Sequence, residues 1–390
     1  MKPRKITDRV RLLGAQDFDR RLFDELIPLP DGTSYNAYLV EGSERTALID
    51  TVDPKKSEIL LDQLAGIGRI DYVVSQHTEQ DHSGTIPQVL ELYPDAKVLA
   101  SPKARSTLVD HLHIDPERIR EVEDGEAFSL GDRTLEFIHT PWVHWPETIL
   151  TYLPEERILF TCDLFGSHLA TTEIYAHDPV RVHDAAKRYY AEIMMPFRKI
   201  IEKHLKRLEG YEIETICPSH GPVHDDPSFI IDAYRSWVLD PPANLVVLPY
   251  ASMHGSTELM VKHLISALVE RGVEVSPFNL TVTDLGRLAE ALVEAGVVVF
   301  GTPTVLTGPH PSVVSAAYLV AALRPKLKYG AIIGSYGWAG KALDAVKSLT
   351  APLKLKWLEP VMVKGLPRDE DYASLDRLAD GIAARNKGIG

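Results

Sequence analysis

At 390 residues the chain has room for two or three domains, and a composition of 45% hydrophobic and 25% charged residues is typical of a soluble globular protein. The net charge of −13 argues against nucleic-acid binding, and no apolar run reaches the roughly 18–20 residues that span a bilayer. The start of the chain is polar and unlike a signal peptide, so we expect a cytoplasmic location, and the two cysteines, Cys162 and Cys217, exclude a metal site built from four cysteines of one chain.

The first part of the chain alternates short β-rich segments with helical ones. The β-rich segments are residues 47–50, 72–75, 97–100, 134–139, 148–153, 157–163 and 213–217. Helical patterns cover residues 56–64, 86–92 and 185–208. The segments 148–153 and 157–163 flank Pro154-Glu155-Glu156 and predict a hairpin. This mixture of strands and helices indicates a layered α/β domain.

The second part alternates regularly. Asp240-Pro241-Pro242 predicts a linker, because paired prolines interrupt periodic structure. Predicted strands follow at 244–249, 273–278, 297–301, 329–335 and 357–363, with helices at 257–271, 285–295, 311–323, 341–349 and 372–385 between and after them. Nearly continuous apolar strands between amphipathic helices indicate a doubly wound parallel sheet. We therefore expect one domain over residues 1–242 and a second over residues 243–390.

A dense group of potential metal ligands follows the apolar segment 72–75. It comprises His77, Glu79, Asp81 and His82, four ligating side chains within six residues. A lone histidine is usually an ordinary surface or core residue, but four ligating types at this spacing favour a metal site.

Three more candidate ligands lie where other apolar strands end. His144 follows segment 134–139, Asp163 ends segment 157–163, and His220 follows segment 213–217. Strand ends of this kind converge on one edge of a sheet. The apolar surroundings of Cys162 and Cys217 favour buried, unreactive thiols over further ligands.

The ligand pattern resembles the metallo-β-lactamase superfamily, whose loop reads His-x-His-x-Asp-His, with Glu79 in place of the second histidine. Imidazole-rich sites suit zinc, whereas mixed imidazoles and carboxylates suit redox-active iron. The full string is similar to that of one subfamily, the flavodiiron proteins (A-type flavoproteins). That resemblance implies an N-terminal αββα sandwich with His77, Glu79 and His144 on one iron ion. It further implies Asp81, His82 and His220 on the other, with Asp163 bridging both.

This chain departs from the family pattern at two places near the ligands. Phe23-Asp24 stands where many members have Phe-His, and an acidic residue there would alter hydrogen bonding above the metals. Trp142-Val143 precedes His144, where smaller residues are common. In some members a water replaces the ligand at the position of His82, so this ligand is the one that the resemblance fixes least.

A phosphate-binding pattern opens the second domain. Residues 249–257 join a strand to a helix with small, hydroxyl-bearing residues and a glycine, and they lack the Gly-Lys-Ser/Thr of a triphosphate loop. They resemble the phosphate loop of flavodoxins, which binds FMN, and loops at 301–308 and 334–340 resemble the two loops that hold the flavin ring. The predicted FMN contacts are Ser252, Met253, His254, Gly255, Ser256, Thr257, Pro303, Thr304, Val305, Gly308, Ser335, Tyr336, Gly337, Trp338, Ala339 and Gly340.

The resemblance implies an oxidoreductase that reduces dioxygen to water, nitric oxide to nitrous oxide, or both, with electrons passing from FMN to the iron pair. It also implies a head-to-tail homodimer, or a dimer of such dimers, with the FMN of one subunit beside the iron pair of the other. The cysteine count leaves no fused rubredoxin domain in this sequence, so a separate rubredoxin, or reduced deazaflavin, is the expected donor. Two alternatives stay open: a zinc hydrolase carrying an inert flavodoxin-like module, and a non-catalytic flavoprotein carrier or gas sensor.

Overall fold

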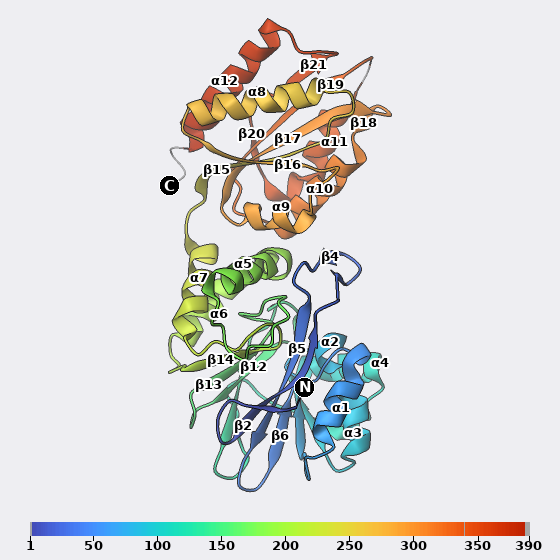
Figure 1. Ribbon diagram of the computed structural model, residues 1–390, viewed down its shortest axis with the longest axis vertical. Coiled ribbons are helices and arrows are strands. Elements are labelled where there is room, and N and C mark those ends of the chain that lie inside the picture. Colours follow the sequence, from blue (N-terminus) through green and yellow to red (C-terminus); the bar gives the residue numbers. More distant parts are fainter. Residues whose placement is uncertain (1, 339, 387–390) are drawn as a thin grey trace. The chain divides into compact units, whose positions relative to one another are not determined.

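The computed structural model describes residues 2–338 and 340–386 and divides into two compact units, Met1–Val238 and Leu239–Gly390 (Figure 1). The proline pair that predicts a linker, Pro241 and Pro242, lies just after this division. Among the described residues, no helix combines the length and the hydropathy needed to cross a membrane.

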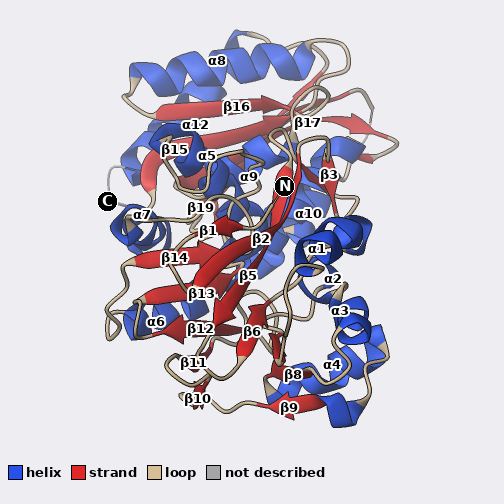
Figure 2. Ribbon diagram, turned by 60° about the horizontal axis from the view of Figure 1, so that its bottom comes forward, coloured by secondary structure: helices blue, strands red, loops and turns tan. Residues whose placement is uncertain are grey.

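Two sheets form the centre of the first unit (Figure 2). The first sheet contains, in spatial order, β1 (Arg4–Lys5), β2 (Val10–Asp17), β5 (Thr33–Glu41), β6 (Thr46–Ile49), β7 (Tyr72–Val74), β8 (Lys97–Ala100) and β9 (Ile119–Glu121). The second contains β10 (Ala127–Ser129), β11 (Thr134–His139), β12 (Ile149–Leu153), β13 (Ile158–Cys162) and β14 (Thr215–Pro218). A separate hairpin joins β3 (Leu22–Phe23) to β4 (Ile27–Pro28).

Helices cover the outer faces of both sheets. Tyr38 and Ile49 of the first sheet share a core with Phe137 and Phe160 of the second, so apolar side chains fill the space between the sheets. The outer face of the first sheet packs against α1 (Ser57–Leu64), α3 (Ile86–Leu92) and α4 (Pro102–Leu112). On the side of the second sheet lie α5 (Pro179–Tyr189), α6 (Arg198–Leu208) and α7 (Pro227–Leu239) (Figures 1 and 2). The predicted αββα sandwich is therefore confirmed.

The strands β12 and β13 are antiparallel neighbours, which confirms the predicted hairpin. Every residue of both strands is buried, because a strand covered on both faces needs apolar side chains throughout. The single helix predicted over residues 185–208 is wrong. A π-helical turn (Tyr190–Met194) and a 3-10 turn (Met195–Phe197) separate α5 from α6, and Pro196 lacks the N–H that a continuous helix requires at this point.

The second unit is a parallel sheet with helices on both faces (Figure 1). Its strands, in spatial order, are β16 (Glu274–Asn279), β15 (Ala243–Tyr250), β17 (Ala295–Val305), β19 (Tyr329–Tyr336) and β20 (Lys356–Trp357), with β18 (Gly308–Pro309) beside β17 and β21 (Val361–Lys364) beside β19. The helices α8 (Ser256–Glu270) and α12 (Asp369–Asn386) pack on one face. The helices α9 (Leu285–Leu292), α10 (Pro311–Leu323) and α11 (Ala342–Leu349) lie on the other (Figure 1).

This strand order confirms the predicted flavodoxin-like sheet, in which ligands bind beyond the carboxyl ends of the strands. Two details differ from prediction. The strand expected over 357–363 is split into β20 and β21. The strand β17 also runs further than expected, because its parallel pairing with β19 continues to Pro303, so Thr302 and Pro303 lie in the sheet and not in a loop.

Candidate metal and flavin sites

The seven predicted ligands gather at the ends of four strands of the first unit. His77 lies three residues beyond β7, and Glu79 precedes the short helix α2 (Gln80–Ser83), which carries Asp81 and His82. The remaining three follow strands of the second sheet: His144 after β11, Asp163 after β13 and His220 after β14.

His77, Glu79, His144 and Asp163 form the first cluster, with their ligand atoms all within 4.8 Å of one another. The Oε2 atom of Glu79 lies 3.2 Å from Nε2 of His77 and 3.1 Å from Nε2 of His144. The Oδ2 atom of Asp163 lies 3.7 and 3.3 Å from the same two nitrogens.

Asp81, His82 and His220 form the second cluster. The Nε2 atom of His220 lies 3.1 Å from Oδ2 of Asp81, and Nε2 of His82 lies 3.4 Å from Oδ1 of Asp81. The Oδ1 atom of Asp163 lies 3.0 Å from Nε2 of His82 and 3.4 Å from Nε2 of His220. One carboxylate oxygen of Asp163 thus faces each cluster.

These separations fit two metal ions. Ligand atoms about 2.0–2.2 Å from one ion are roughly 2.8–3.6 Å apart at ordinary coordination angles. Both oxygens of Asp81 and both of Asp163 are buried and accept no hydrogen bond among the described residues. Buried carboxylates without donors are costly, so these two side chains have the surroundings of metal ligands.

Hydrogen bonds on the far side of two histidines fix their orientation. The Nδ1 atom of His77 donates to Oε1 of Glu147 at 2.8 Å, and Nδ1 of His220 donates to the carbonyl of Ser34 at 2.6 Å. Each bond turns the Nε2 atom toward the cluster. Although burial raises the pKa of Glu147, hydrogen bonds from His77 and Thr78 lower it to about 2, so this acceptor is anionic.

Four rings, which we call the aromatic wall, pack around His220: Phe23, Tyr35, His168 and Tyr189. Their centroids lie 6.2, 5.8, 5.1 and 5.9 Å from that of His220, respectively. Low-polarity walls of this kind exclude water and suit a small uncharged substrate.

The hairpin β3–β4 brings Asp24 to the metal ligands. Partial burial, together with the carboxylates of Glu79 and Asp81, raises the pKa of Asp24 to about 6. The residue is in the left-handed region, with φ of 49°, at the turn of the hairpin. The acidic departure noted in the sequence therefore lies beside the candidate centre.

In the second unit, a cavity of about 170 Å³ lies at the carboxyl ends of the strands. It is lined by Ser252, Met253, His254, Ser256, Thr257, Pro303, Thr304, Ser335, Tyr336, Gly337 and Gly365. The helix α8 begins here after Gly255, whose φ is 87° and which has no side chain to cap the helix; in the first turn the Ser252 hydroxyl accepts from the N–H of Glu258. Uncapped N–H groups at a helix N-terminus are suited to a phosphate.

Comparison with known proteins places the chain among established relatives. Residues 33–221 match the family model described as the ODP family beta lactamase. The chain is 38% identical to a nitric oxide reductase of Moorella thermoacetica, over 98% of this chain and 99% of that protein. It belongs to the flavodiiron protein family.

Solved structures of the family have the same fold. The rubredoxin oxygen:oxidoreductase of Desulfovibrio gigas superposes on this flavodiiron protein with a TM-score of 0.96 at 32% identity, covering 100% of this chain and 99% of that one. The flavodiiron protein of Giardia intestinalis gives a TM-score of 0.94 at 26% identity, covering 100% and 98%. Membership of the family implies FMN and a di-iron centre.

The structure brings all seven predicted metal ligands of this flavodiiron protein together. Ten of the predicted flavin contacts line the cavity, and Gly365, which was not predicted, lines it too. Gly255, Val305, Gly308, Trp338 and Gly340 lie outside its lining. Ala339 lies outside the described residues.

Sequence reasoning missed a second layer of polar residues around the ligands. Asp50, directly after β6, is buried and accepts from the backbone N–H and the side-chain amide of Gln76 at 2.8 and 2.9 Å. Ligating atoms of Asp50, His82 and Cys162 lie within 4.8 Å of one another. Both cysteines are buried, as expected, and burial raises the pKa of each thiol.

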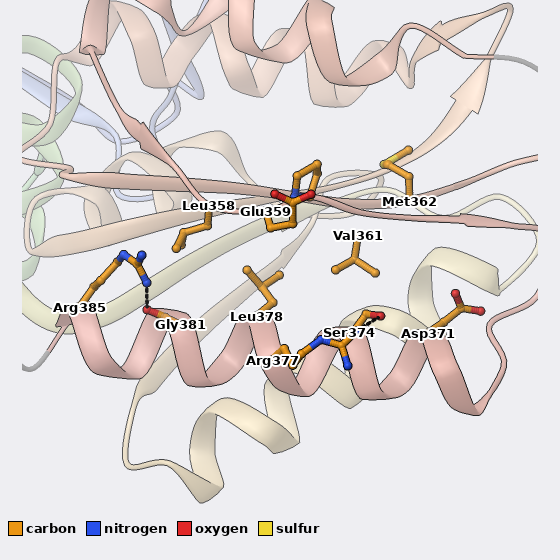
Figure 3. Close-up of a pocket in the computed structure, with 11 residues that line it drawn as sticks. Leu358, Glu359, Val361, Met362, Asp371, Ser374, Arg377, Leu378, Gly381 and Arg385 are labelled. Atoms are coloured by element: carbon orange, nitrogen blue, oxygen red, sulfur yellow. Dashed lines mark hydrogen bonds between the residues drawn. The ribbon is translucent and has the colours of Figure 1, made fainter.

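A larger cavity, of about 610 Å³, lies between the β20–β21 segment and α12 (Figure 3). Its two arginines bond within their own helix, Arg385 to the carbonyl of Gly381 and Arg377 to the hydroxyl of Ser374. The cavity contains none of the predicted flavin contacts.

Proposed function

We propose that this flavodiiron protein reduces dioxygen to water, nitric oxide to nitrous oxide, or both, using electrons that reach a di-iron centre through FMN. The names of two relatives, a nitric oxide reductase and a rubredoxin oxygen:oxidoreductase, support both gases and support rubredoxin as the separate donor. Dioxygen takes up four electrons and four protons to give two waters. Two nitric oxide molecules take up two electrons and two protons to give nitrous oxide and one water.

The observation that carries the proposal is the position of Asp163. Its two oxygens are buried, accept no hydrogen bond among the described residues, and face different clusters. A carboxylate in this position suits a bridge between two ions, whereas a single zinc site needs no such bridge.

The ligand set also suits the charge of an iron pair. Glu79, Asp81 and Asp163 offset most of the positive charge of two ferrous ions, and the four histidines add neutral donors. When bound, the iron pair and FMN supply the redox chemistry. The protein side chains hold the ions, fix the imidazoles through Glu147 and Ser34, and exclude water through the aromatic wall.

The proposal includes a head-to-tail homodimer, or a dimer of such dimers. Large apolar side chains are exposed in the segments around both sites. Leu306 (93%), Trp338 (79%) and Leu366 (63%) lie near the flavin cavity, and Leu26 (68%) lies on the β3–β4 hairpin. Exposed apolar patches of this kind are typical of surfaces that another subunit covers.

The function is tested with protein purified without oxygen, in which iron, zinc and FMN are quantified first. The photoreduced protein is then given each gas separately. We expect about two iron ions and one FMN per chain and catalytic consumption of at least one gas. Full zinc occupancy would support the hydrolase alternative, and FMN without gas turnover would support the carrier or sensor. Reduced rubredoxin and reduced deazaflavin are then compared as donors.

Replacing Glu147 by glutamine tests the outer support of the metal site. We expect iron affinity to fall by about 10-fold, at the lower end of the loss seen for such partners, because glutamine keeps an acceptor for His77 but not the charge. Affinity is measured by competition with an iron chelator, with FMN content as an internal standard. Glu44→Gln, a change at an exposed glutamate, is the control. Equal iron affinity in the two variants would contradict this role.

Replacing Thr257 by valine tests the phosphate site. Thr257 is buried, and its hydroxyl lies 3.1 Å from that of Ser335 across the cavity. Loss of a hydrogen bond to a charged phosphate weakens FMN binding by roughly 10-fold or more. Fluorescence titration of the apoprotein with FMN measures this, and iron content should not change. Thr257→Ser keeps the hydroxyl and should bind FMN almost normally; unaltered affinity in the valine variant would refute the assignment.

A further inference from the structure

One nitrogen of the aromatic wall has no partner. His168 lies a few residues after β13 in the sequence. The residue is buried, with only 6% of its surface exposed. Its Nδ1 atom lies 2.9 Å from the hydroxyl of Thr33 in β5. Its Nε2 atom is buried and has no hydrogen-bond partner among residues 2–338 and 340–386.

The ring of His168 is held in place by its neighbours. Its centroid lies 4.8 Å from that of Tyr189, 4.9 Å from that of Phe23 and 5.1 Å from that of His220. Since His220 belongs to the second metal cluster, His168 lies in the layer of side chains directly around that cluster. It is not close enough to the other ligating atoms to belong to the cluster itself.

The hydrogen bond at Nδ1 determines what Nε2 can do. The Thr33 hydroxyl lies 2.9 Å from Nδ1 and 3.4 Å from the carbonyl of Ser34, and we assign its proton to the shorter contact, which leaves the ring proton of the neutral imidazole on Nε2. Elsewhere in the wall, the Tyr35 hydroxyl is already bonded to Arg20 at 2.6 Å. A buried N–H without an acceptor is unfavourable, and a bound ligand or water normally accounts for one.

We propose that the Nε2–H of His168 donates a hydrogen bond to the small ligand at the second metal cluster, either the gas or an anion that takes its place. This inference rests on the proposed di-iron function. It makes His168 a ligand-binding residue and Thr33 a positioning residue that acts by fixing the ring. Phe23 supplies apolar packing in the same wall.

The test uses azide as the probe and the oxidised, iron-loaded protein. Azide affinity is measured by absorption titration in the wild type and in His168→Phe, which keeps the ring and removes both nitrogens. We expect azide to bind about 10-fold more weakly, as the loss of one hydrogen bond predicts. Thr33→Val keeps the imidazole but frees its Nδ1 side, and we expect a smaller loss of about threefold. The relative KM values for dioxygen and nitric oxide provide a second readout.

His224→Phe is the matched control. His224 is also buried in the first unit, but it bonds to the carbonyl of Phe165 and is not part of the aromatic wall. Its azide affinity should equal that of the wild type. An iron-loaded His168→Phe protein with wild-type azide affinity would overturn the inference while leaving the proposed function intact. Loss of iron from both the His168→Phe and the Thr33→Val proteins would also overturn it, because it would show a purely structural role. A wild-type protein that binds no iron would instead overturn the proposed function.

Discussion

Replacing Asp163 by alanine should remove most of the iron and nearly all gas reduction while FMN stays bound. Asp163 faces His77 and His144 with one oxygen and His82 and His220 with the other, so the change takes a ligand from both ions at once. Loss of a residue that only hydrogen-bonds to a metal ligand typically lowers metal affinity by about 10–100-fold. Loss of a ligand that both ions share should therefore lower it by at least about 100-fold. Iron and FMN are quantified in the same sample, which separates metal loss from unfolding.

Two variants sharpen this prediction. Asp163→Asn keeps the size of the side chain and one acceptor oxygen but loses the charge, and it should retain iron poorly. Asp62→Ala removes an exposed carboxylate from α1 and should bind iron normally. An iron-replete Asp163→Ala protein that reduces gas at the normal rate would refute the bridging role.

Gly221→Ala should destabilise the first unit and deplete the second metal cluster. Gly221 has φ of 80°, and a Cβ atom there would lie 2.1 Å from the Ser167 hydroxyl and 2.9 Å from its carbonyl oxygen. The Gly221 N–H donates to the Ser34 hydroxyl at 2.7 Å, and His220 next to it donates to the Ser34 carbonyl. Any shift that relieves the clash therefore moves a proposed ligand. We expect a loss of roughly 2–4 kcal/mol in the free energy of unfolding.

The matched control for this glycine is Gly125→Ala. Gly125 has φ of 78°, but a Cβ atom there would meet nothing within 4 Å. Alanine at this position would have the backbone strain of a positive φ but no steric clash. We expect this strain to lower the free energy of unfolding by about 1 kcal/mol. Denaturant unfolding of the metal-free variants and their iron content after reconstitution are compared. If both variants lose the same stability and bind iron equally well, the steric argument at Gly221 is wrong.

The metal ligands could be predicted because each interrupts or follows an apolar strand, and because parallel strands bring such positions to one edge. Asp50 follows β6 in the same way but was not predicted. The sequence pattern alone does not distinguish a carboxylate that orients its neighbours, as Asp50 does, from one that binds a metal. The second layer of polar residues around the ligands has no local pattern in the sequence by which it could be predicted. Ser34 reaches His220 across 186 positions of the chain, and only the pairing of distant elements shows this.

The prediction of secondary structure from the sequence was wrong where tertiary contacts override the local preference of the chain. The periodicity of residues 185–208 is helical throughout, yet the chain forms a π-helical turn there, within which Tyr190 packs on Tyr234 and Trp237. In the second unit, glycine and proline at 301–303 suggested a loop, but pairing with β19 keeps these residues in β17. Partners distant in sequence decided both cases.

The central claim is that Asp163 joins two iron ions, and crystallography with anomalous scattering tests it most directly. Data collected on either side of the iron absorption edge should show two peaks, one beside each carboxylate oxygen of Asp163 and each about 2.0–2.2 Å from its ligands. Data at the zinc edge should show no comparable signal. A single peak, or two peaks that scatter as zinc, would contradict the account.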